Sequence, residues 1–305
     1  MTETTTTPPA APVRIDSPAR RIFREFMEDR IAVIGLILFV LVAAIAIAAP
    51  WIAPQNPYDL SQLDIMDSAL PPGEVSFGTG QTYWLGTDQQ GRDMLSAIIY
   101  GLRISLLVAT VSLGLAITIG TVVGVTAAYF GGRLDSFIMR IVDLQLSFPA
   151  ILIALILLAL LGRGVDKVIL ALVIVQWAYY ARTVRSSAIV ERRKDYIDAA
   201  RCLALPNRRI MFRHLLPNCI PPLIVVATVQ VAQAIALEAT LSFLGVGVPI
   251  TEPSLGLLIA NGYDYLLSGV YWISLFPGIA LVVTIIAINL VGDRLRDVLN
   301  PRLQK

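Results

Sequence analysis

The chain has 305 residues, of which 56% are hydrophobic and only 15% are charged. Together with a mean hydropathy of +0.72, this composition excludes an ordinary soluble globular protein. The net charge of +2 gives no sign of nucleic-acid binding, so we expect lipid to be the main surroundings of the chain.

Six apolar stretches are candidates to cross a bilayer, which takes about 20 residues of helix. They cover residues 31–49, 104–130, 137–161, 168–180, 220–244 and 270–291. The fourth is short, but Trp177, Tyr179 and Tyr180, followed by Arg182 and Arg185, are typical of an interfacial aromatic belt next to cations. We predict an all-α polytopic membrane protein with six transmembrane helices. A closed β-barrel would instead show short alternating segments.

Lysine and arginine residues gather in alternate loops. The segments 1–30, 131–140, 181–219 and 292–305 hold 20 of the 24 cations. Because cytoplasmic loops accumulate such cations, we expect a multi-pass protein of the cell inner membrane with both termini in the cytoplasm. Residues 50–103 then form a long external segment.

The first apolar stretch has an alternative interpretation. A charged start, an apolar run and Ala46-Ile47-Ala48 are also found in cleavable signal peptides, but the run exceeds their usual length. An uncleaved membrane anchor is therefore favoured. Residues 1–13 are rich in Thr, Pro and Ala, and we expect a disordered tail there.

A stripe of small residues marks the second apolar stretch. Ser112, Ala116, Gly120, Gly124 and Ala128 recur every four residues on one helical face. Small side chains at this spacing let two helices approach closely. We expect this small-residue stripe to pack against another helix, in preference to lining a substrate path.

Few polar residues interrupt the apolar stretches. Glu238 lies in the fifth, with Gln230 and Gln233 one to two turns earlier. Ionisable residues inside a membrane usually face a bundle interior or an aqueous cavity. These three residues are candidates for a pathway or gate, and a structural role for Glu238 is an equal alternative. Arg140 and Asp143, three residues apart, are expected to form a local ion pair.

The sequence offers no constellation for catalysis. None of its three lysines follows a glycine, so the G-x-x-x-x-G-K-S/T loop that binds ATP phosphates is absent. Cys202 and Cys219 fall in a predicted cytoplasmic loop, where thiols stay reduced, and His214 is the single histidine. We expect no catalytic residue, no metal site and no membrane-embedded enzyme, so that a partner must hydrolyse any ATP. A dense relay of acids and histidines, as in proton-coupled carriers, is also missing.

The loop 182–217 is predicted to hold two short helices. Residues 188–203 read as a helix, Pro206-Asn207 break it, and residues 208–216 resume it. The cations in this loop are compatible with anionic lipid contact. A pair of helices on a loop is equally suited to be a rigid docking site for a soluble partner.

Several motifs resemble those of a known family. Asp198-Ala199-Ala200, Ala204 and Leu216-Pro217 fall in the register of the E-A-A-x3-G-x9-I-x-L-P signature of permease subunits of binding-protein-dependent ABC importers. Further segments are similar to the C-type permeases of the dipeptide, oligopeptide and nickel class, and these are 85–93, 147–149, 238–247, 276–278 and 289–302. The resemblance covers nearly the whole chain from residue 31 onward.

The resemblance implies a type I ABC importer permease fold and a set of partners. These would be a homologous second permease subunit, two ATP-binding ATPase subunits and an extracytoplasmic solute-binding protein, with ATP and Mg on the ATPase subunits and no cofactor on this chain. The cargo would be di- or oligopeptides delivered by the binding protein. Nickel or glutathione import is the alternative within this class, and a passive channel or secondary carrier is the alternative outside it. The implied ATPase-coupling residues are Asp198, Ala199, Ala200, Ala204, Leu205, Leu216 and Pro217.

The resemblance also divides the chain. Residues 1–30 would be a cytoplasmic tail, residues 31–103 the first transmembrane helix plus an external loop, and residues 104–292 the permease domain with the coupling loop 182–217. Residues 293–305 would be a second cytoplasmic tail.

The chain departs from the signature at three positions. Asp198 stands for its Glu, Ala204 for its Gly and His214 for its Ile. The change at Ala204 is the least conservative, because glycine permits a left-handed turn that alanine disfavours.

Overall fold

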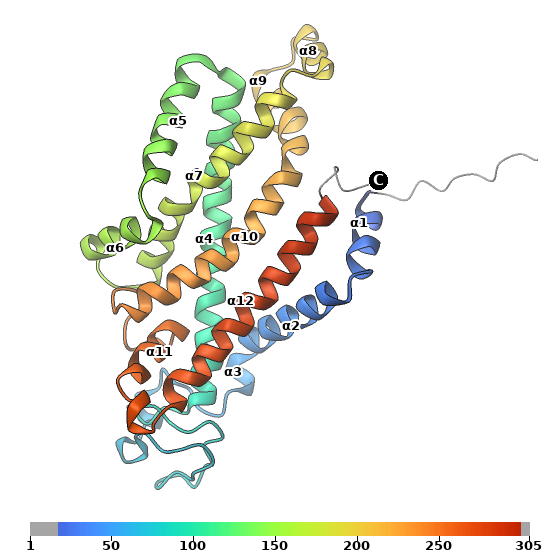
Figure 1. Cartoon of the computed structure of the whole chain (residues 1–305). Coiled ribbons are helices and arrows are strands. Elements are labelled where there is room, and N and C mark those ends of the chain that lie inside the picture. The colour runs from blue at the N-terminus through green and yellow to red at the C-terminus, as the bar shows by residue number, and fades with distance from the viewer. Residues whose placement is uncertain (1–17, 300–305) are drawn as a thin grey trace, which may run out of the picture.

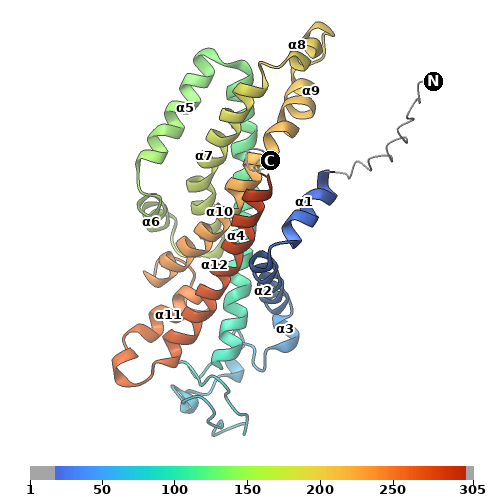
Figure 2. The same ribbon diagram turned by 45° about the vertical axis from the view of Figure 1, so that its right-hand side comes forward.

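The computed structural model describes residues 18–299, and the regular secondary structure in this range is helical apart from two isolated β-bridges. The long helices run between an end that carries α8 and an opposite end of irregular chain (Figures 1 and 2). The all-α prediction is therefore confirmed. The expected disordered tail of residues 1–13 and the last residues of the predicted C-terminal tail, 300–305, lie outside the described residues.

The helices follow one another along the chain as follows. They are α1 (Pro18–Met27), α2 (Arg30–Ile47), α3 (Ala49–Ile52), η1 (Leu60–Gln62), η2 (Ile65–Asp67), α4 (Met94–Phe130), α5 (Gly132–Ser147), α6 (Ala150–Leu161), α7 (Val165–Glu191), α8 (Asp195–Cys202), α9 (Asn207–Arg209), the π-helix η3 (Ile210–Leu215), α10 (Leu216–Phe243), α11 (Leu255–Tyr263), η4 (Leu266–Ser268) and α12 (Trp272–Leu299).

Five of the described helical runs are long and apolar enough to cross a membrane: α2, α4, α7, the run Asn207–Phe243 and α12. The sixth predicted span is divided into α5 and α6, which meet at an angle of 91°. The expectation of one helix over residues 137–161 is therefore wrong. Phe148 leaves the helical region, with φ −96° and ψ 144°, because the proline that follows it disfavours helical backbone and has no N–H to donate.

The fourth predicted span is much longer than its apolar stretch. α7 has 27 residues and continues through two arginines that pair with α5. Arg185 donates two hydrogen bonds to Asp135, at 2.6 and 2.7 Å. Arg182 pairs with Asp143, so the expected local pair between Arg140 and Asp143 is wrong. These contacts across helices let α7 extend beyond its apolar residues.

The small-residue stripe of α4 is buried against α7, as predicted. A Cβ atom on Gly120 would lie 2.6 Å from the Cβ of Tyr180, and one on Gly124 would overlap the backbone of Ala181. Two helices can approach this closely only where side chains are absent. The α4–α7 pair is thus the central contact of the bundle.

The first and last long helices pack together on one side of this pair (Figure 1). A Cβ atom on Gly35 of α2 would lie 2.6 Å from the Cβ of Leu290 in α12. Just before the start of α2, the Arg294 guanidinium donates a hydrogen bond to the Glu25 carbonyl oxygen and so joins α12 to α1. α11, which sequence patterns did not predict, packs against α12 and α10 after a cap from Ser254.

The irregular segment of residues 53–93, which we call the cap, is stabilised by a buried carboxylate. Asp67 accepts hydrogen bonds from the Ser76 hydroxyl at 2.6 Å, the Tyr83 hydroxyl at 2.9 Å and the Phe77 N–H at 2.9 Å. Burial alone raises the pKa of Asp67, but these hydrogen bonds outweigh it and hold the pKa below its usual value. The segment that was predicted to be external is therefore ordered by polar contacts.

A second polar contact lies inside the motif 85–93. The Arg92 guanidinium pairs with Asp88 at 2.6 Å, and both side chains are at most 2% exposed. The Trp272 indole N–H donates to the Thr87 carbonyl oxygen at 3.1 Å and joins the cap to α12. The motif is thus part of the framework of the cap.

Three apolar clusters follow one another along the bundle. The first joins α4, α11 and α12 near the cap through residues such as Met94 and Ile273. The second joins α4, α7 and α10 through Leu172 and Ile235. The third includes Ile197 and extends from α4, α7 and α10 into α8. The short helix α8 therefore shares a core with the long helices.

Candidate coupling segment and candidate pathway

Residues 192–209, which we call the α8 segment, form the tip of the molecule opposite the cap (Figures 1 and 2). The segment connects α7 to the run of η3 and α10. Any force on α8 therefore reaches the ends of two long helices directly.

The chain turns between α7 and α8, so the expectation of one helix over residues 188–203 is wrong. α7 ends at Glu191 and α8 begins at Asp195. At the turn, Arg192 Nη1 donates hydrogen bonds to the carbonyl oxygens of Ala128 and Tyr129, at 2.6 and 2.9 Å. These are among the last carbonyls of α4, where the helix dipole favours a cation. The contact stabilises the chain reversal that a continuous helix would prevent.

The inner face of α8 is apolar. Ile197 is fully buried and Ala200 is 5% exposed, and both belong to a cluster with Ile210, Met211 and Leu215. This packing seats α8 on η3 and the start of α10. Ala200 therefore contacts the chain's own core.

Polar contacts join the start of α8 to α7 and α10. The Tyr196 hydroxyl donates to Glu191 Oε1 at 2.7 Å, and the Asn218 amide donates to the Tyr196 oxygen at 3.0 Å. Burial, together with the nearby Glu191 carboxylate, raises the pKa of Tyr196 to about 12. The hydroxyl is therefore protonated near neutral pH and can act as both donor and acceptor.

The end of α8 is a Schellman motif with alanine in the left-handed position. Ala204 has a φ of 53°, its N–H donates to the Arg201 carbonyl oxygen at 2.9 Å, and the Leu205 N–H donates to the Ala200 carbonyl oxygen at 3.2 Å. The sequence departs from the family glycine here, yet the backbone adopts the turn that glycine would favour. A left-handed alanine costs about 1 kcal/mol.

The seven predicted coupling residues divide between the two faces of the α8 segment and the start of α10. The exposed residues are Asp198, Ala199, Ala204 and Pro217, and the buried or half-buried residues are Ala200, Leu205 and Leu216. Leu203, which sequence reasoning missed, is 74% exposed at the tip. Its position four residues after Ala199 puts both on one helical face and could have identified it. Together they form an exposed apolar surface.

The three predicted pathway residues do not lie together. Gln233 is exposed and Gln230 is 7% exposed, and both line a cavity of about 400 Å³. Glu238 is fully buried elsewhere on α10 and accepts hydrogen bonds from Ser105 and Ser242, each at 2.8 Å. Glu238 thus joins α10 to α4, and in this conformation it does not line the cavity.

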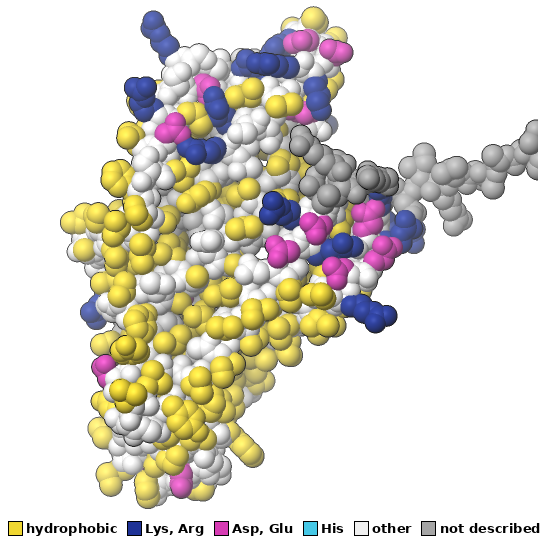
Figure 3. Space-filling view, viewed as in Figure 1, with side chains coloured by type: hydrophobic (Ala, Val, Ile, Leu, Met, Phe, Trp, Pro, Cys, Tyr) yellow, Lys and Arg dark blue, Asp and Glu magenta, His cyan; other side chains and the backbone are white. Residues whose placement is uncertain are grey.

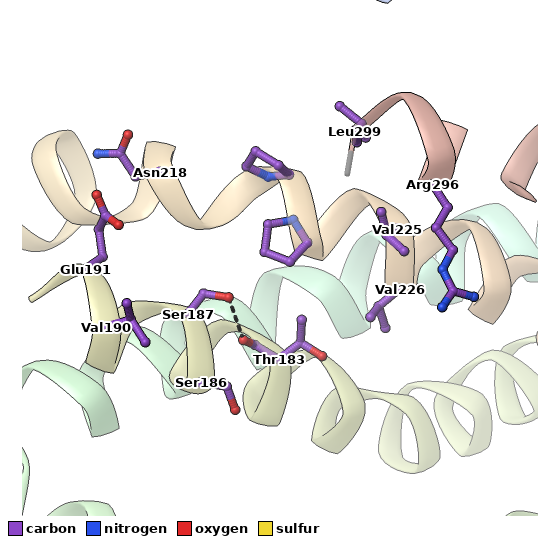
Figure 4. A pocket seen from close by; sticks show the side chains of 12 residues that line it. Thr183, Ser186, Ser187, Val190, Glu191, Asn218, Val225, Val226, Arg296 and Leu299 are labelled. Carbon is purple, nitrogen blue, oxygen red and sulfur yellow. Dashed lines mark hydrogen bonds between the residues drawn. The ribbon is translucent and has the colours of Figure 1, made fainter. Parts of the chain in front are cut away.

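A larger cavity of about 780 Å³ adjoins this one, between α7, α10 and the end of α12 (Figure 4). Thr183 and Ser187 line one side, Asn218 and Val225 line another, and Arg296 of α12 closes one end. The two cavities share Val225, Val226 and Arg296. We call the larger cavity the groove.

Among residues 18–299, no group of three or more His, Cys, Asp or Glu side chains is arranged to hold a metal ion. Cys202 is exposed and Cys219 is buried, and neither forms a disulfide. The expectation that the chain has no catalytic residue, metal site or cofactor stays a prediction.

Two family models match the chain. The model of binding-protein-dependent transport system inner membrane components matches residues 116–305. The model of the N-terminal transmembrane domain of oligopeptide transport permease C matches residues 17–72. Between them the two models match the beginning of the chain and its larger C-terminal part.

Individual proteins are similar over nearly their full length. A Brucella abortus protein, assigned by inference to a peptide transport system as a permease, is 42% identical over 94% of this chain and 93% of its own. The dipeptide transport system permease protein DppC of Escherichia coli is 39% identical over 97% of both chains. The di/tripeptide transport system permease protein DppC of Pseudomonas aeruginosa is 36% identical over 94% of this chain and 93% of its own.

The helical arrangement matches a solved structure as well. A chain of the MetNI methionine ABC transporter in an inward-facing conformation superposes with a TM-score of 0.56 and 23% identity, over 68% of this chain and 98% of that one. The predicted type I fold is therefore confirmed.

Proposed function

Because this chain belongs to the family of binding-protein-dependent transport system inner membrane components, we propose that it is the permease subunit of an ATP-driven importer of di- and oligopeptides. The observation that carries the proposal is the α8 segment, which exposes Ala199 and Leu203 while its inner face packs onto η3 and α10. The names of the most similar relatives favour peptides as cargo.

The proposed mechanism is alternating access driven from the α8 segment. ATP binding by two partner ATPase subunits, which also hold Mg, would draw this segment and its counterpart on a second permease together. Since Tyr196 joins α8 to both Glu191 of α7 and Asn218 of α10, α7 and α10 would follow as a unit. Rigid-body motion of this kind turns a push at one end into opening at the other.

The charges favour one orientation in the membrane. Lysine and arginine side chains gather around the end that carries α8 and near α1 (Figure 3). Because cations accumulate on the cytoplasmic side, we place this end and both termini in the cytoplasm of the cell inner membrane. The cap then faces outward.

The cap has the properties of a docking surface for the solute-binding protein. Ile65, Met66 and Phe77 are each at least 75% exposed on it. Exposed apolar side chains that lie together on an ordered frame are typical of protein contact sites. We assign to this surface the delivery of loaded cargo.

The ATPase contact is tested by Leu203→Arg, with Leu267→Arg as the matched control. Leu203 is 74% exposed on the α8 segment, and Leu267 is fully exposed near the cap, so neither substitution disturbs a core. Each variant is purified in mild detergent from its native membranes, and the accompanying subunits are identified by mass spectrometry. We expect Leu203→Arg to lose the ATPase subunits and peptide uptake, and Leu267→Arg to retain the ATPase subunits.

Recovery of the ATPase subunits with Leu203→Arg at the wild-type level would contradict the docking assignment. Reproducible isolation of the wild-type chain without any ATPase would favour a channel or secondary carrier instead. Uptake of nickel or glutathione by the purified complex, without peptide uptake, would show that the cargo is one of the alternatives within the same class.

A further inference from the structure

The two ends of the groove differ in charge. Arg296 lies at one end, and Glu191 and Asn218 lie at the other (Figure 4). Among the described residues that line the groove and its neighbouring cavity, Arg296 is the only cation. It forms no ion pair with any residue in the range 18–299. The guanidinium is therefore available to an anion that enters the groove.

The opposite end is rich in hydrogen-bond acceptors. Pro221 and Pro222 lie inside α10 and have no N–H, so the carbonyl oxygens of Pro217 and Asn218 cannot receive the usual bond from four residues later. Glu191 at this end already contacts Lys194 and Tyr196. Carbonyl oxygens that lack this usual bond and lie near a carboxylate are suited to a ligand ammonium group.

The distance between the two ends of the groove matches the length of a short peptide. Val225 lines the groove beside Arg296, and Asn218 lies seven residues before Val225 on the same helix. At about 1.5 Å per residue, the ends are about 10 Å apart. An extended chain spans at most about 3.5 Å per residue, so about three residues fill this length.

We propose that the groove holds a zwitterionic tripeptide during transport, with its C-terminal carboxylate on Arg296 and its ammonium group at the acceptor end. The guanidinium suits a carboxylate because it offers two parallel N–H donors. The inference rests on the proposed function and names a specificity-determining residue for it. It also connects cargo binding with the ATP-driven motion of the α8 segment. The reason is that α7 and α10, which form the groove walls, are joined by the α8 segment.

The test compares two cargoes that differ only at the C-terminus. The complex is purified with its partner subunits, reconstituted in liposomes with the solute-binding protein, and supplied with trialanine or trialanine amide. Arg296→Gln is expected to lower trialanine uptake about tenfold and to change amide uptake less than about twofold. Since the binding protein is the same in every assay, a change in the ratio of the two rates belongs to this chain.

Arg213→Gln is the matched control, because Arg213 is an exposed cation on η3 that does not line the groove. We expect it to leave the ratio unchanged. An equal fall for both cargoes in Arg296→Gln would overturn the inference and indicate a structural or lipid-phosphate contact, and an unchanged ratio with unchanged rates would also overturn it. Failure of the wild-type complex to import either cargo would instead contradict the proposed function.

Discussion

The cap and the α8 segment, at opposite ends of the bundle, are stabilised in opposite ways. The cap has little regular structure and buries several of its charges, among them Asp67 and the pair of Asp88 and Arg92. The α8 segment is helical, packs through Ile197 and Ala200, and exposes its charges.

This difference indicates different duties. Buried, hydrogen-bonded charges tolerate little displacement, because an unpaired buried charge is costly. An apolar inner face with an exposed outer face keeps a helix seated while a partner contacts it. We therefore expect the cap to behave as a fixed frame and the α8 segment to move together with α7 and α10.

The largest effect is expected from breaking the buried ion pair of the cap, which tests whether the cap is a fixed frame. Asp88→Asn leaves the guanidinium of Arg92, which is 1% exposed, without a carboxylate. We expect the cap to lose about 3–5 kcal/mol of stability, measured as faster protease cleavage of the cap in the purified protein. Glu74→Gln, at an exposed carboxylate in the same segment, is the control, and equal cleavage of the two variants would contradict the fixed frame.

The next test concerns the apolar packing that holds α8 against η3 and the start of α10. Ala200→Glu places a carboxylate at a site that is 5% exposed and lined by Ile197 and Met211. Burying this unpaired charge costs about 3 kcal/mol or more, so we expect α8 to detach and uptake to be abolished while the protein stays inserted. Hydrogen exchange of the α8 amides measures the detachment, and Ala199→Glu on the exposed face should leave exchange unchanged. Normal uptake by Ala200→Glu would remove α8 from the mechanism.

Acid should open the cap gradually. Hydrogen bonds lower the pKa of Asp67 in the folded chain, so its contribution to stability is full above the unfolded value of about 3.9 and is lost as pH falls through the lowered pKa. We expect cap amides to stay protected at pH 5 and to exchange faster below about pH 4, after correction for the intrinsic rate. Asp67→Asn should show no such dependence; a midpoint above pH 5 in the wild type would exclude Asp67 as the cause.

The smallest expected effect comes from replacing one alanine by glycine in the cap and one in the α8 segment. Ala69 in the cap and Ala204 in the α8 segment are the described non-glycine residues with positive φ, at 54° and 53°. Glycine removes the steric cost but adds freedom to the unfolded chain, so each change should stabilise its region by about 0.5–1 kcal/mol. Slower local hydrogen exchange is the measure. Faster exchange at either position would show that the alanine side chain contributes packing there.

Sequence patterns predicted the spans well where solvation alone decides them. The apolar stretches near α2, α4, α10 and α12 were placed to within a few residues, with two exceptions. α4 begins ten residues before its predicted start at residue 104, and α12 continues eight residues beyond its predicted end at residue 291. The break at Phe148 and Pro149 was missed, although the proline is visible, because the apolar run continues through it. The arginines of α7 obscured its length, since their partners Asp135 and Asp143 lie about 40 to 50 residues away.

The sequence motif located the α8 segment, but it did not show which of its residues lie on the buried face and which lie on the exposed face. The register of Asp198 to Pro217 marked the segment, yet it did not separate buried Ala200 from exposed Ala199. Nor did it indicate that Glu238 hydrogen-bonds Ser105, 133 positions earlier in the chain. Such distinctions depend on which helix lies beside which, and no local pattern contains that information.

The sequence by itself determined that this chain is a helical membrane protein, because the free energy of burying apolar stretches in lipid depends on composition and length. The permease class was indicated by the resemblance of its motifs to a known family. The same resemblance placed Ala204 where the family has a glycine, but only the structure showed that the alanine adopts a left-handed conformation. Only the tertiary structure decided the division of the α8 segment into two faces, the ordered cap and the groove that Arg296 closes. These features arise where residues distant in sequence meet, and contact energies depend on their positions in space.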